Sequence, residues 1–380
     1  MPPTAAADVQ LWATTTGGGH RRVAEAVKRA LEEQGPPGIR VAIDDPLLSG
    51  ALPHARLLLL SYGPLVRSSP GIWGLLFRTF ARPAARRALE HFLMSGLSGA
   101  MTTLTAARQP RVVVNCHPLL GPAAFRAAQG LVAPARMLTL ITDLTVVHPG
   151  WLSPAGARFL SPSAIASSWC SGQGIPSAQI VETGLPVDPL LARTARDPAS
   201  RESLRRELGL DSDRLCLIVG GGGEGAGRMQ LLVRALATSG LPIQLVVLCG
   251  RNRQLLSWLR KHRFQLPVRA LPYTPDPSPW LLAADCYVGK AGPSALCEAA
   301  AAGLGILVTD ALPGQESANR QLLVDAGAAR AVASAADLLL VVARMCDHKD
   351  RLLSSLQRAS AAWSRPEAAS LAAAEILAWL

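Results

Sequence analysis

The chain is poor in aromatic and charged residues, and it lacks the long apolar runs of membrane-spanning proteins. Of its 380 residues, 49% are hydrophobic, 17% are charged and 4% are aromatic. This composition excludes intrinsic disorder, and the length suits two domains of about 150–200 residues each. No window of about 18 residues is continuously apolar, so we expect no transmembrane helix.

The cysteines form no metal-binding or redox motif. Seven are scattered without a CxxC pair, and Cys116, Cys216 and Cys249 lie in apolar, strand-like runs. Buried thiols in a reducing compartment are therefore expected. The first residues show no basic segment followed by an apolar one, so we predict no secretory signal and expect a cytoplasmic location.

Acidic residues are scarce relative to basic ones. The chain has 27 Asp and Glu against 38 Lys and Arg, a net charge of +11. Between Ala51 and Pro110 the only acid is Glu90, whereas seven arginines occur there: Arg56, Arg67, Arg78, Arg82, Arg86, Arg87 and Arg108. Such an excess suits an anionic membrane, a phosphorylated substrate or nucleic acid.

The arginine-rich stretch 56–92 is also strongly apolar. Its sequence, RLLLLSYGPLVRSSPGIWGLLFRTFARPAARRALEHF, places Trp73, Phe77 and Phe80 among the arginines. One interpretation is an amphipathic segment at an anionic membrane surface, which would make the protein peripherally membrane-associated. The other is a helical hairpin that packs its apolar side on its own domain. The sequence favours neither.

Short strand-like runs alternate with helical patterns along the chain. We expect strands near Val9–Thr14, Arg40–Ile43, Val112–Asn115, Met137–Thr142, Arg158–Ser161, Ile180–Thr183, Leu215–Gly220, Gln244–Cys249, Val268–Leu271, Asp285–Val288 and Ile306–Thr309. This alternation predicts two doubly wound α/β domains, 1–190 and 191–354, with their ligand loops at the carboxyl ends of the strands. A terminal helical segment, 355–380, is expected to pack back on the first domain.

Three histidines and an aspartate mark strand and helix ends in the first half of the chain. In LWATTTGGGHRRVAEAVKRAL, a strand gives way to Gly17, Gly18 and Gly19 and then to a helix beginning at His20. The helix dipole would lower the pKa of His20 and keep it neutral, as a general base requires. The other candidates at such junctions are His117, Asp143 and His148. For His117 the alternative is a bond to a loop backbone, and for Asp143 it is a turn cap.

The second half contains loops suited to phosphate. LCLIVGGGGEGAGRMQLLVRAL reads as strand, glycine loop and helix, with Glu224 inside the loop and no Gly-Lys-Ser/Thr of a P-loop. In VVLCGRNRQLLSWL, Arg251 ends a strand, where its planar fork could pair with phosphate. The alternative is an ordinary surface arginine.

A second phosphate-type turn follows the strand ending near Val288. In VGKAGPSALCEA the turn at Ala291, Gly292, Pro293 and Ser294 opens a helix whose amino end can hold a diphosphate. Glu298, early in this helix, could bind a ribose, or it could be an ordinary helix-start acid. Gln315 and Glu316 in PGQE could bind sugar hydroxyls.

The motifs GGGH, HPLL, TDL…VHPGW, GLPV, GGGEGAG, CGRN, KAGPSALCEA and PGQE occur in this order between residues 11 and 330. Together they resemble the diacylglycerol glycosyltransferases, which are the monogalactosyldiacylglycerol synthases and the processive diacylglycerol glucosyltransferases. These enzymes are similar in turn to the peptidoglycan enzyme that adds N-acetylglucosamine to a lipid intermediate.

The resemblance implies a GT-B fold, two Rossmann-like domains facing a cleft, with a UDP-sugar donor, inversion at the anomeric carbon and no metal. It assigns the diphosphate to Gly221, Gly222, Gly223, Glu224 and Gly225 and to the turn at Ala291, Gly292, Pro293 and Ser294, the nucleotide pocket to Arg251, the ribose to Glu298, and the sugar to Gln315 and Glu316. It assigns the reaction centre and acceptor site to Gly17, Gly18, Gly19, His20, His117, Asp143 and His148.

Some positions depart from the pattern. Thr14-Thr15-Thr16 precede the glycines where an acidic or serine-like residue is usual, and Ser294 stands where glycine is common. PYTPDPSPWLLAAD replaces a more apolar segment expected near the uracil. None of these changes removes a group that the chemistry requires.

The expected function is glycolipid biosynthesis by transfer of galactose or glucose from a UDP-sugar to diacylglycerol. Between the two sugars, and between diacylglycerol and another lipophilic alcohol, the sequence does not choose. A nucleotide-sugar epimerase of the same fold is an alternative, although it would need no lipid-binding segment. A nucleic-acid-binding protein would place lysines, arginines and stacking aromatics along one face, and this chain places glycines and carboxylates instead.

Overall fold

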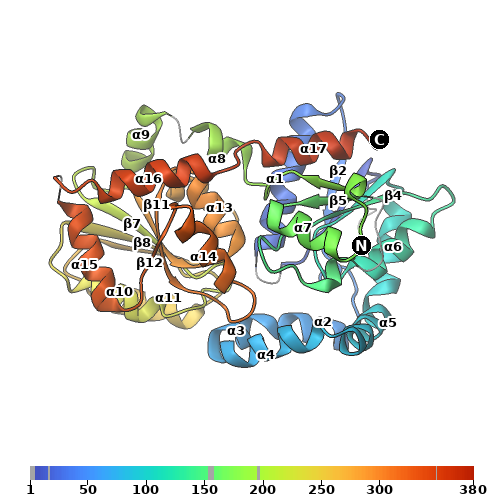
Figure 1. Cartoon of the computed structure of the whole chain (residues 1–380), viewed down its shortest axis with the longest axis horizontal. Helices are drawn as coiled ribbons and strands as arrows, with labels where there is room; N and C mark the ends of the chain where they lie inside the picture. The colour runs from blue at the N-terminus through green and yellow to red at the C-terminus, as the bar shows by residue number, and fades with distance from the viewer. Residues whose placement is uncertain (1–4, 16–17, 153–157, 195–196, 348) are drawn as a thin grey trace. The chain divides into compact units, whose positions relative to one another are not determined.

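The computed structural model describes residues 5–15, 18–152, 158–194, 197–347 and 349–380, which form two compact units (Figure 1). The first unit comprises Met1–Leu65, Gly71–Pro189 and Glu367–Leu380. The second comprises Val66–Pro70 and Leu190–Pro366. Each unit is built on a parallel sheet of six strands within these residues.

The first sheet has the order β2-β1-β3-β4-β5-β6. Its strands are β1 Val9–Trp12, β2 Val41–Asp44, β3 Val112–Asn115, β4 Arg136–Leu140, β5 Arg158–Ser161 and β6 Ile180–Glu182. Every residue of β1 and β3 is buried, as expected of central strands covered on both faces. The reversal of strand order beside β1 is the topological switch at which α/β sheets bind ligands.

The second sheet has the order β12-β11-β10-β7-β8-β9. Its strands are β7 Leu215–Gly220, β8 Ile243–Leu248, β9 Val268–Leu271, β10 Cys286–Lys290, β11 Gly305–Asp310 and β12 Arg330–Ala331. A core of aliphatic side chains from β7, β8 and the helices α10 (Met229–Ala237) and α15 (Ala335–Cys346) fills one face. The eleven expected strands are present within a few residues of their predicted limits, and β12 was missed because two residues carry no pattern.

The helices, in chain order, are α1 Gly19–Gln34, α2 Pro53–Leu60, α3 Tyr62–Ser68, α4 Pro70–Phe80, α5 Pro83–Arg108, α6 Gly121–Gln129, α7 Ala164–Gly172, α8 Pro189–Thr194, α9 Pro198–Leu208, α10 Met229–Ala237, α11 Arg253–Lys261, α12 Ser278–Ala283, α13 Pro293–Ala301, α14 Ser317–Asp325, α15 Ala335–Cys346, α16 Leu352–Trp363 and α17 Ala368–Leu377. Short 3-10 turns occur at Pro149–Leu152 and Ser177–Gln179. No helix among the described residues is long and apolar enough to cross a bilayer.

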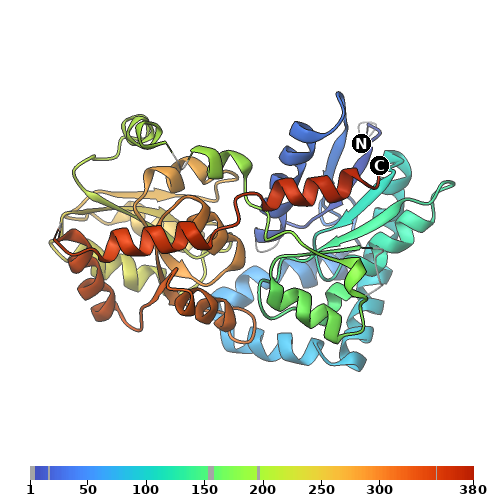
Figure 2. The same cartoon turned by 45° about the horizontal axis from the view of Figure 1, so that its top comes forward.

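The terminal segment 355–380 contains two structures rather than one. Helix α16 belongs to the second unit, where it packs on β11 and α13. Helix α17 belongs to the first unit and packs along α1 (Figures 1 and 2). The chain therefore returns to its first unit only after Pro366, so the compact units do not divide at 354/355.

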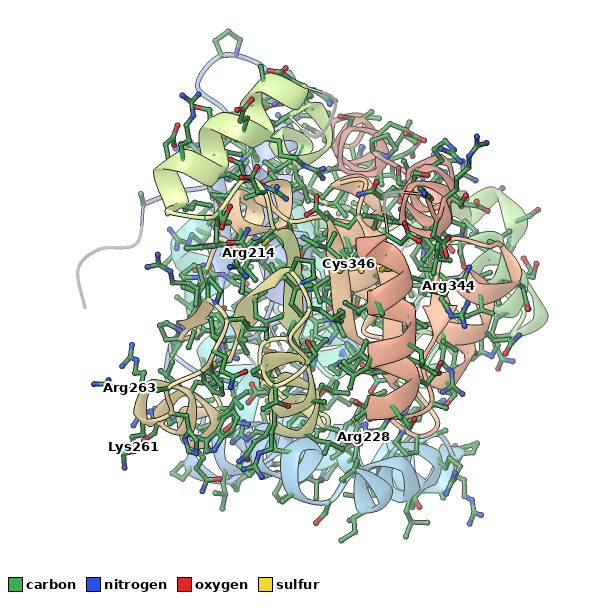
Figure 3. The ribbon with its side chains drawn as sticks, turned by 90° about the vertical axis from the view of Figure 1, so that its left-hand side faces the viewer. Arg214, Arg228, Lys261, Arg263, Arg344 and Cys346 are labelled. Atoms are coloured by element: carbon green, nitrogen blue, oxygen red, sulfur yellow. The ribbon has the colours of Figure 1, made fainter. Side chains whose placement is uncertain are left out.

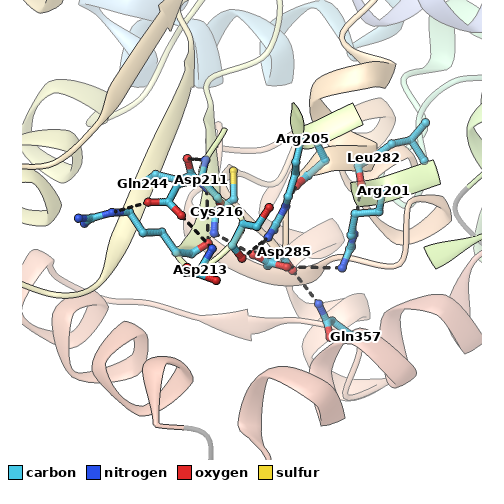
Figure 4. Close-up of polar contacts among 12 residues, drawn as sticks. Arg201, Arg205, Asp211, Asp213, Cys216, Gln244, Leu282, Asp285 and Gln357 are labelled. Carbon is cyan, nitrogen blue, oxygen red and sulfur yellow. Dashed lines mark hydrogen bonds and ion pairs between the residues drawn. The ribbon is translucent and has the colours of Figure 1, made fainter. Parts of the chain in front are cut away.

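A polar cluster at the amino ends of the second sheet's strands ties three elements together (Figure 4). The Asp285 carboxylate accepts hydrogen bonds from Arg205 at 2.6 Å and from the Cys216 amide at 2.8 Å, and it forms an ion pair with Arg201. Gln357 of α16 donates to the Asp285 carbonyl at 3.1 Å. Asp285 thus links α9, β7 and α16 at the edge opposite the ligand loops.

Exposed basic residues lie on the second unit, and the cysteines are distributed over both units. Lys261 and Arg263, at and just beyond the end of α11, are exposed and project outward (Figure 3). Cys116, Cys216 and Cys249 are buried as expected, and burial raises the pKa of Cys249 to about 11. Cys346 alone among the seven cysteines is partly exposed.

Candidate active site

Charged side chains gather at the carboxyl ends of neighbouring strands in the second sheet. Because β7, β8, β10 and β11 are parallel, the loops that follow them lie at one edge. Three ion pairs join these loops: Glu224 with Arg251, Asp310 with Arg228, and Glu316 with Lys290. Each pair takes its cation and its carboxylate from different strand ends, so every cation is already balanced by an anion.

The glycine loop after β7 approaches its neighbours closely. Gly222 has a φ of 69°, and a Cβ placed there would lie 3.1 Å from Cε of Lys290. The Gly223 carbonyl accepts a hydrogen bond from the Arg251 amide at 2.9 Å. Helix α10 begins only at Met229, and the Asp310 carboxylate lies at its amino end, bonded to Arg228 Nε at 2.9 Å. The amino end of α10 is therefore held by a carboxylate in this structure.

Glu224, inside this loop, is buried between two arginines. Its Oε1 accepts from Arg251 at 2.9 Å, and its Oε2 accepts from Arg67 at 2.7 Å. Arg67 lies on Val66–Pro70, the short segment that belongs to the second unit. The Arg251 guanidinium also stacks 4.2 Å from the centre of the Tyr273 ring. The Arg251 side chain is thus held in place by its neighbours. This disfavours the alternative that it is an ordinary surface arginine.

The turn after β10 presents the amino end of α13. Gly292 is the N-cap, followed by Pro293 and Ser294 as the first helical residues, and the Ala291 amide bonds to the Asp310 carbonyl at 2.8 Å. The first amides of a helix have no intrahelical acceptor and attract anions. Glu298 is buried and lies in the second turn of the helix rather than the first.

Lys290, to which the sequence alone assigns no role, lies on a central strand end of this edge. Its ammonium pairs with Glu316, and the other Glu316 oxygen accepts from the Leu312 amide at 3.0 Å. Both oxygens of Glu316 are therefore engaged. Gln315, beside it, is partly exposed. The sequence shows only that a lysine follows a strand. Its pairing with Glu316 depends on the fold.

Two aromatic rings of the first unit, those of His117 and Trp151, lie against its candidate base, His20. The ring centres of His20 and His117 are 4.5 Å apart, and those of His20 and Trp151 are 5.9 Å apart. Helix α1 begins at Gly19 with Gly18 as its N-cap, so His20 is the second helical residue. Gly17 lies outside the described residues.

His20 is neutral at physiological pH for a reason other than the expected one. Burial lowers its pKa to about 4, and a hydrogen bond to the Cys116 backbone opposes this shift only in part. The leading cause is therefore desolvation, whereas the sequence reading relied on the helix dipole. The His20 Nδ1 lies 2.9 Å from the Thr142 hydroxyl, a neighbour that the sequence reading missed because 122 residues separate the two.

His117 and His148 are fixed by their own loops. Nδ1 of His117 accepts from the Leu119 amide at 3.2 Å, and Nδ1 of His148 accepts from the Gly150 amide at 3.1 Å. Because Nδ1 accepts in both rings, the neutral forms carry their proton on Nε2. Burial lowers the pKa of His148 to about 4 and that of His117 well below its usual range.

Asp143 organises the loop that carries His148 and Trp151. Its Oδ2 accepts from the His148 amide at 3.0 Å and from Trp151 Nε1 at 2.8 Å. Burial raises its pKa to about 6 against these two bonds. The two bonds favour the capping alternative over a direct part in proton transfer.

An Asp-x-Asp sequence, a spacing that can hold a metal-bound diphosphate, occurs at Asp211 and Asp213. It lies at the amino end of β7, opposite the glycine loop. Asp211 Oδ1 accepts from the Asp213 amide at 2.9 Å, and its other oxygen pairs with Arg214. These contacts make it a turn cap before the strand.

The two Rossmann-like sheets with glycine and histidine loops at their strand ends define a protein of the GT-B class. Solved structures of that kind share this fold along the whole chain. MurG of Acinetobacter baumannii matches with a TM-score of 0.56 and 17% identity, covering 98% of this chain and 99% of its own. A UDP-GlcNAc 2-epimerase of Neisseria meningitidis matches with a TM-score of 0.65 and 13% identity, covering 99% and 100%.

Sequence comparison gives the family. Residues 20–187 match the model of monogalactosyldiacylglycerol synthase, and residues 215–370 match the C-terminal domain of glycosyltransferase family 28. A probable monogalactosyldiacylglycerol synthase of Glycine max is 30% identical over 93% of this chain and 68% of its own length. Monogalactosyldiacylglycerol synthase 3 of Arabidopsis thaliana is 30% identical over 93% and 77%. The chain belongs to the monogalactosyldiacylglycerol synthase family and is a glycosyltransferase, which confirms the resemblance and the expected fold.

Proposed function

We propose that this enzyme transfers galactose from UDP-galactose to the free hydroxyl of diacylglycerol with inversion at the anomeric carbon. Support comes from the named relatives and from the division of chemistry between the units, with neutral bases in the first and paired cations in the second. The observation that carries the lipid acceptor is the contact between Phe77, on an exposed apolar helix, and His148, with ring centres 5.2 Å apart.

The reaction assigns a proton transfer to the first unit. The acceptor oxygen bonds to C1 of the hexose, the bond from C1 to the diphosphate oxygen breaks, and UDP leaves with that electron pair. The hydroxyl proton passes to His20, which is neutral because burial lowers its pKa to about 4. Thr142, at 2.9 Å from Nδ1, orients the ring. His117 lies against His20 and lines the acceptor site.

Helix α4 is the feature that suits a lipid surface. Its sequence PGIWGLLFRTF is almost wholly apolar, yet among its residues only Gly74 is buried. Ile72 and Leu75 are 55% and 58% exposed. Exposed apolar side chains on a helix favour contact with acyl chains, and the exposed Arg78 and Arg82 suit anionic head groups. We assign peripheral membrane association to the stretch 56–92.

The hairpin interpretation accounts for other residues of the same stretch. Leu59 and Leu89 are buried in the core beneath α2 and α5. One side of the stretch therefore packs on its own domain, while Ile72 and Leu75 stay exposed. The two interpretations describe different faces of one segment.

We also propose that departure of UDP needs no metal ion. The amino end of α13 and the cations Arg251 and Lys290 are available to balance the charge that develops on the diphosphate. Turnover should therefore persist in excess EDTA. Loss of turnover in EDTA with recovery on adding Mg²⁺ would contradict this part of the proposal.

The decisive assay supplies diacylglycerol vesicles and measures UDP release together with glycolipid. We expect lipid-dependent UDP release with UDP-galactose and slower release with UDP-glucose. The opposite order would make the enzyme a glucosyltransferase. Lipid-independent release or interconversion of the sugar nucleotide would favour the epimerase.

The membrane assignment has its own test. Ile72→Asp with Leu75→Asp should reduce binding to anionic vesicles at least about tenfold, because burying one such side chain contributes about 1.5–3 kcal/mol. Leu340→Asp, a residue 69% exposed on α15, is the matched control and should bind as the unaltered protein does. Equal binding by all three proteins would contradict the assignment.

A further inference from the structure

The three ion pairs at the ligand edge of the second sheet differ in burial. In the Lys290–Glu316 pair the two side chains are 12% and 3% exposed, against 31% and 9% for Arg251–Glu224. The Arg228–Asp310 pair is the most open, at 43% and 24%. Removing an ion pair from water costs free energy, and this cost can exceed the attraction between the two charges. Stability alone therefore does not explain a buried lysine beside two glycine turns.

The Lys290 ammonium lies between two glycine turns. A Cβ on Gly292 would lie 2.9 Å from its Nζ, and a Cβ on Gly222 would lie 3.6 Å from it. Gly222 lies in the turn after β7, and Gly292 is the N-cap of α13. A ligand that contacts both turns would therefore also contact the Lys290 ammonium. Tyr287 holds the strand end in place, because its hydroxyl donates to the carbonyl of Gly220 at 3.2 Å and lies 3.3 Å from that of Lys290.

We propose that Lys290 is the cation that binds the sugar-side phosphate of the donor, and that the Glu316 carboxylate occupies its place while the site is empty. The donor's phosphate displaces the carboxylate from Lys290. Glu316, still anchored by the Leu312 amide, then accepts hydrogen bonds from hydroxyls of the sugar. This rests on the proposed donor, a nucleoside diphosphate sugar, and is independent of the lipid acceptor.

The partner exchange has a chemical rationale. The donor's diphosphate carries two negative charges against one on the carboxylate and offers more hydrogen-bond acceptors, so it can replace the carboxylate at the ammonium. The phosphate nearest the sugar is the one concerned, because Glu316 lies beside both the ammonium and the expected sugar position. As the bond from C1 to oxygen breaks, charge grows on this phosphate, so Lys290 stabilises the departing UDP more than the bound donor.

A series of ligands with zero, one and two phosphates tests the assignment of Lys290 to the sugar-side phosphate. Calorimetry compares uridine, UMP and UDP binding to the full chain and to Lys290→Met. We expect the variant to bind uridine and UMP within about threefold of the unaltered protein. It should bind UDP about 10- to 100-fold more weakly, as loss of a hydrogen bond to a charged group predicts. Unchanged UDP binding, or equal loss for all three ligands, would overturn the proposal.

Glu316→Gln distinguishes partner exchange from a merely structural ion pair. If the carboxylate competes with the phosphate, the variant should bind UDP several-fold more tightly and UDP-galactose relatively more weakly. A structural pair predicts weaker UDP binding, as in Lys290→Met. Should Lys290→Met fold poorly because Glu316 is left buried and unpaired, the double variant Lys290→Met/Glu316→Gln removes both charges and still shows the UDP-specific loss.

Arg228→Met is the matched control because it breaks the open pair with Asp310 at the same edge. We expect it to leave the difference between UMP and UDP unchanged. If it loses UDP affinity as Lys290→Met does, the effect is a general loss of positive charge and the assignment to Lys290 fails. All these measurements use the donor or its fragments without lipid, so a failed glycolipid assay combined with the expected binding results would overturn the acceptor and not Lys290.

Discussion

The candidate sites of the two units solve opposite electrostatic problems. In the first unit, burial lowers the pKa of His20 and His148 to about 4, so rings that could be cations stay neutral. In the second, Arg251 and Lys290 each form an ion pair with a carboxylate. Proton acceptance needs an uncharged base, whereas phosphate binding needs cations that are ready to change partner. The surroundings of each site provide the form that its task requires.

The largest effect is expected at the neutral base. His20→Ala should lower turnover about 100- to 10,000-fold, the usual contribution of a general base, while UDP binding stays unchanged. Steady-state rates with calorimetric UDP titration measure the two quantities. His262→Ala, on the exposed end of α11 in the second unit, is the control. A His20→Ala enzyme that keeps most of its rate would assign the base to another residue.

The next largest effect is expected on the stability of the second unit, at a residue far from its ligand loops. Asp285→Ala should lower the free energy of unfolding by about 3 kcal/mol, because it leaves Arg205, itself buried, without its carboxylate. Calorimetric unfolding of the full chain gives the change. Asp350→Ala removes an ion pair whose arginine is 53% exposed and should have little effect. Similar losses in both variants would mean that exposed and buried pairs contribute alike.

Acid should weaken the first unit through its histidines. Each depressed pKa, from 6.5 to about 4, contributes stability that is present above pH 6.5 and is lost as pH falls through 4. The full loss is about 3 kcal/mol for each ring. We therefore expect Tm to fall between pH 7 and 4.5, and His20→Asn to reduce that fall. A Tm independent of pH over this range would contradict the burial of neutral histidines.

The smallest effect should come from Asp143, whose raised pKa acts in the opposite direction. Its folded pKa of about 6 lies above the usual 3.8, so its contribution is present below pH 3.8 and is lost as pH rises through 6. Asp143→Asn can keep the bonds from His148 and Trp151 and should raise Tm at pH 8 but not at pH 4. Its turnover should stay within about tenfold. A loss as large as that of His20→Ala would make Asp143 part of the proton transfer.

Local sequence patterns predicted much of the fold. Alternating apolar strands and helices indicated two parallel sheets, because each strand's run fits the pleat and each crossover needs a helix. Glycines after strands marked the loops at 18–19, 221–225 and 291–294, since close approach requires a missing side chain. The boundary of the last segment was less accessible, because nothing in the local sequence distinguishes α16 from α17.

The contacts between Lys290 and Glu316 and between His20 and Thr142 cannot be predicted from local sequence patterns. These partners lie 26 and 122 residues apart, and they meet only because parallel strands bring successive loops to one edge. The sequence by itself determined which chemical groups stand at the strand ends, because spacing and glycine are local properties. Only the tertiary structure decided which of those groups are buried and which are paired. Desolvation and ion pairing depend on everything packed around a group, and these two forces make one site neutral and the other charged.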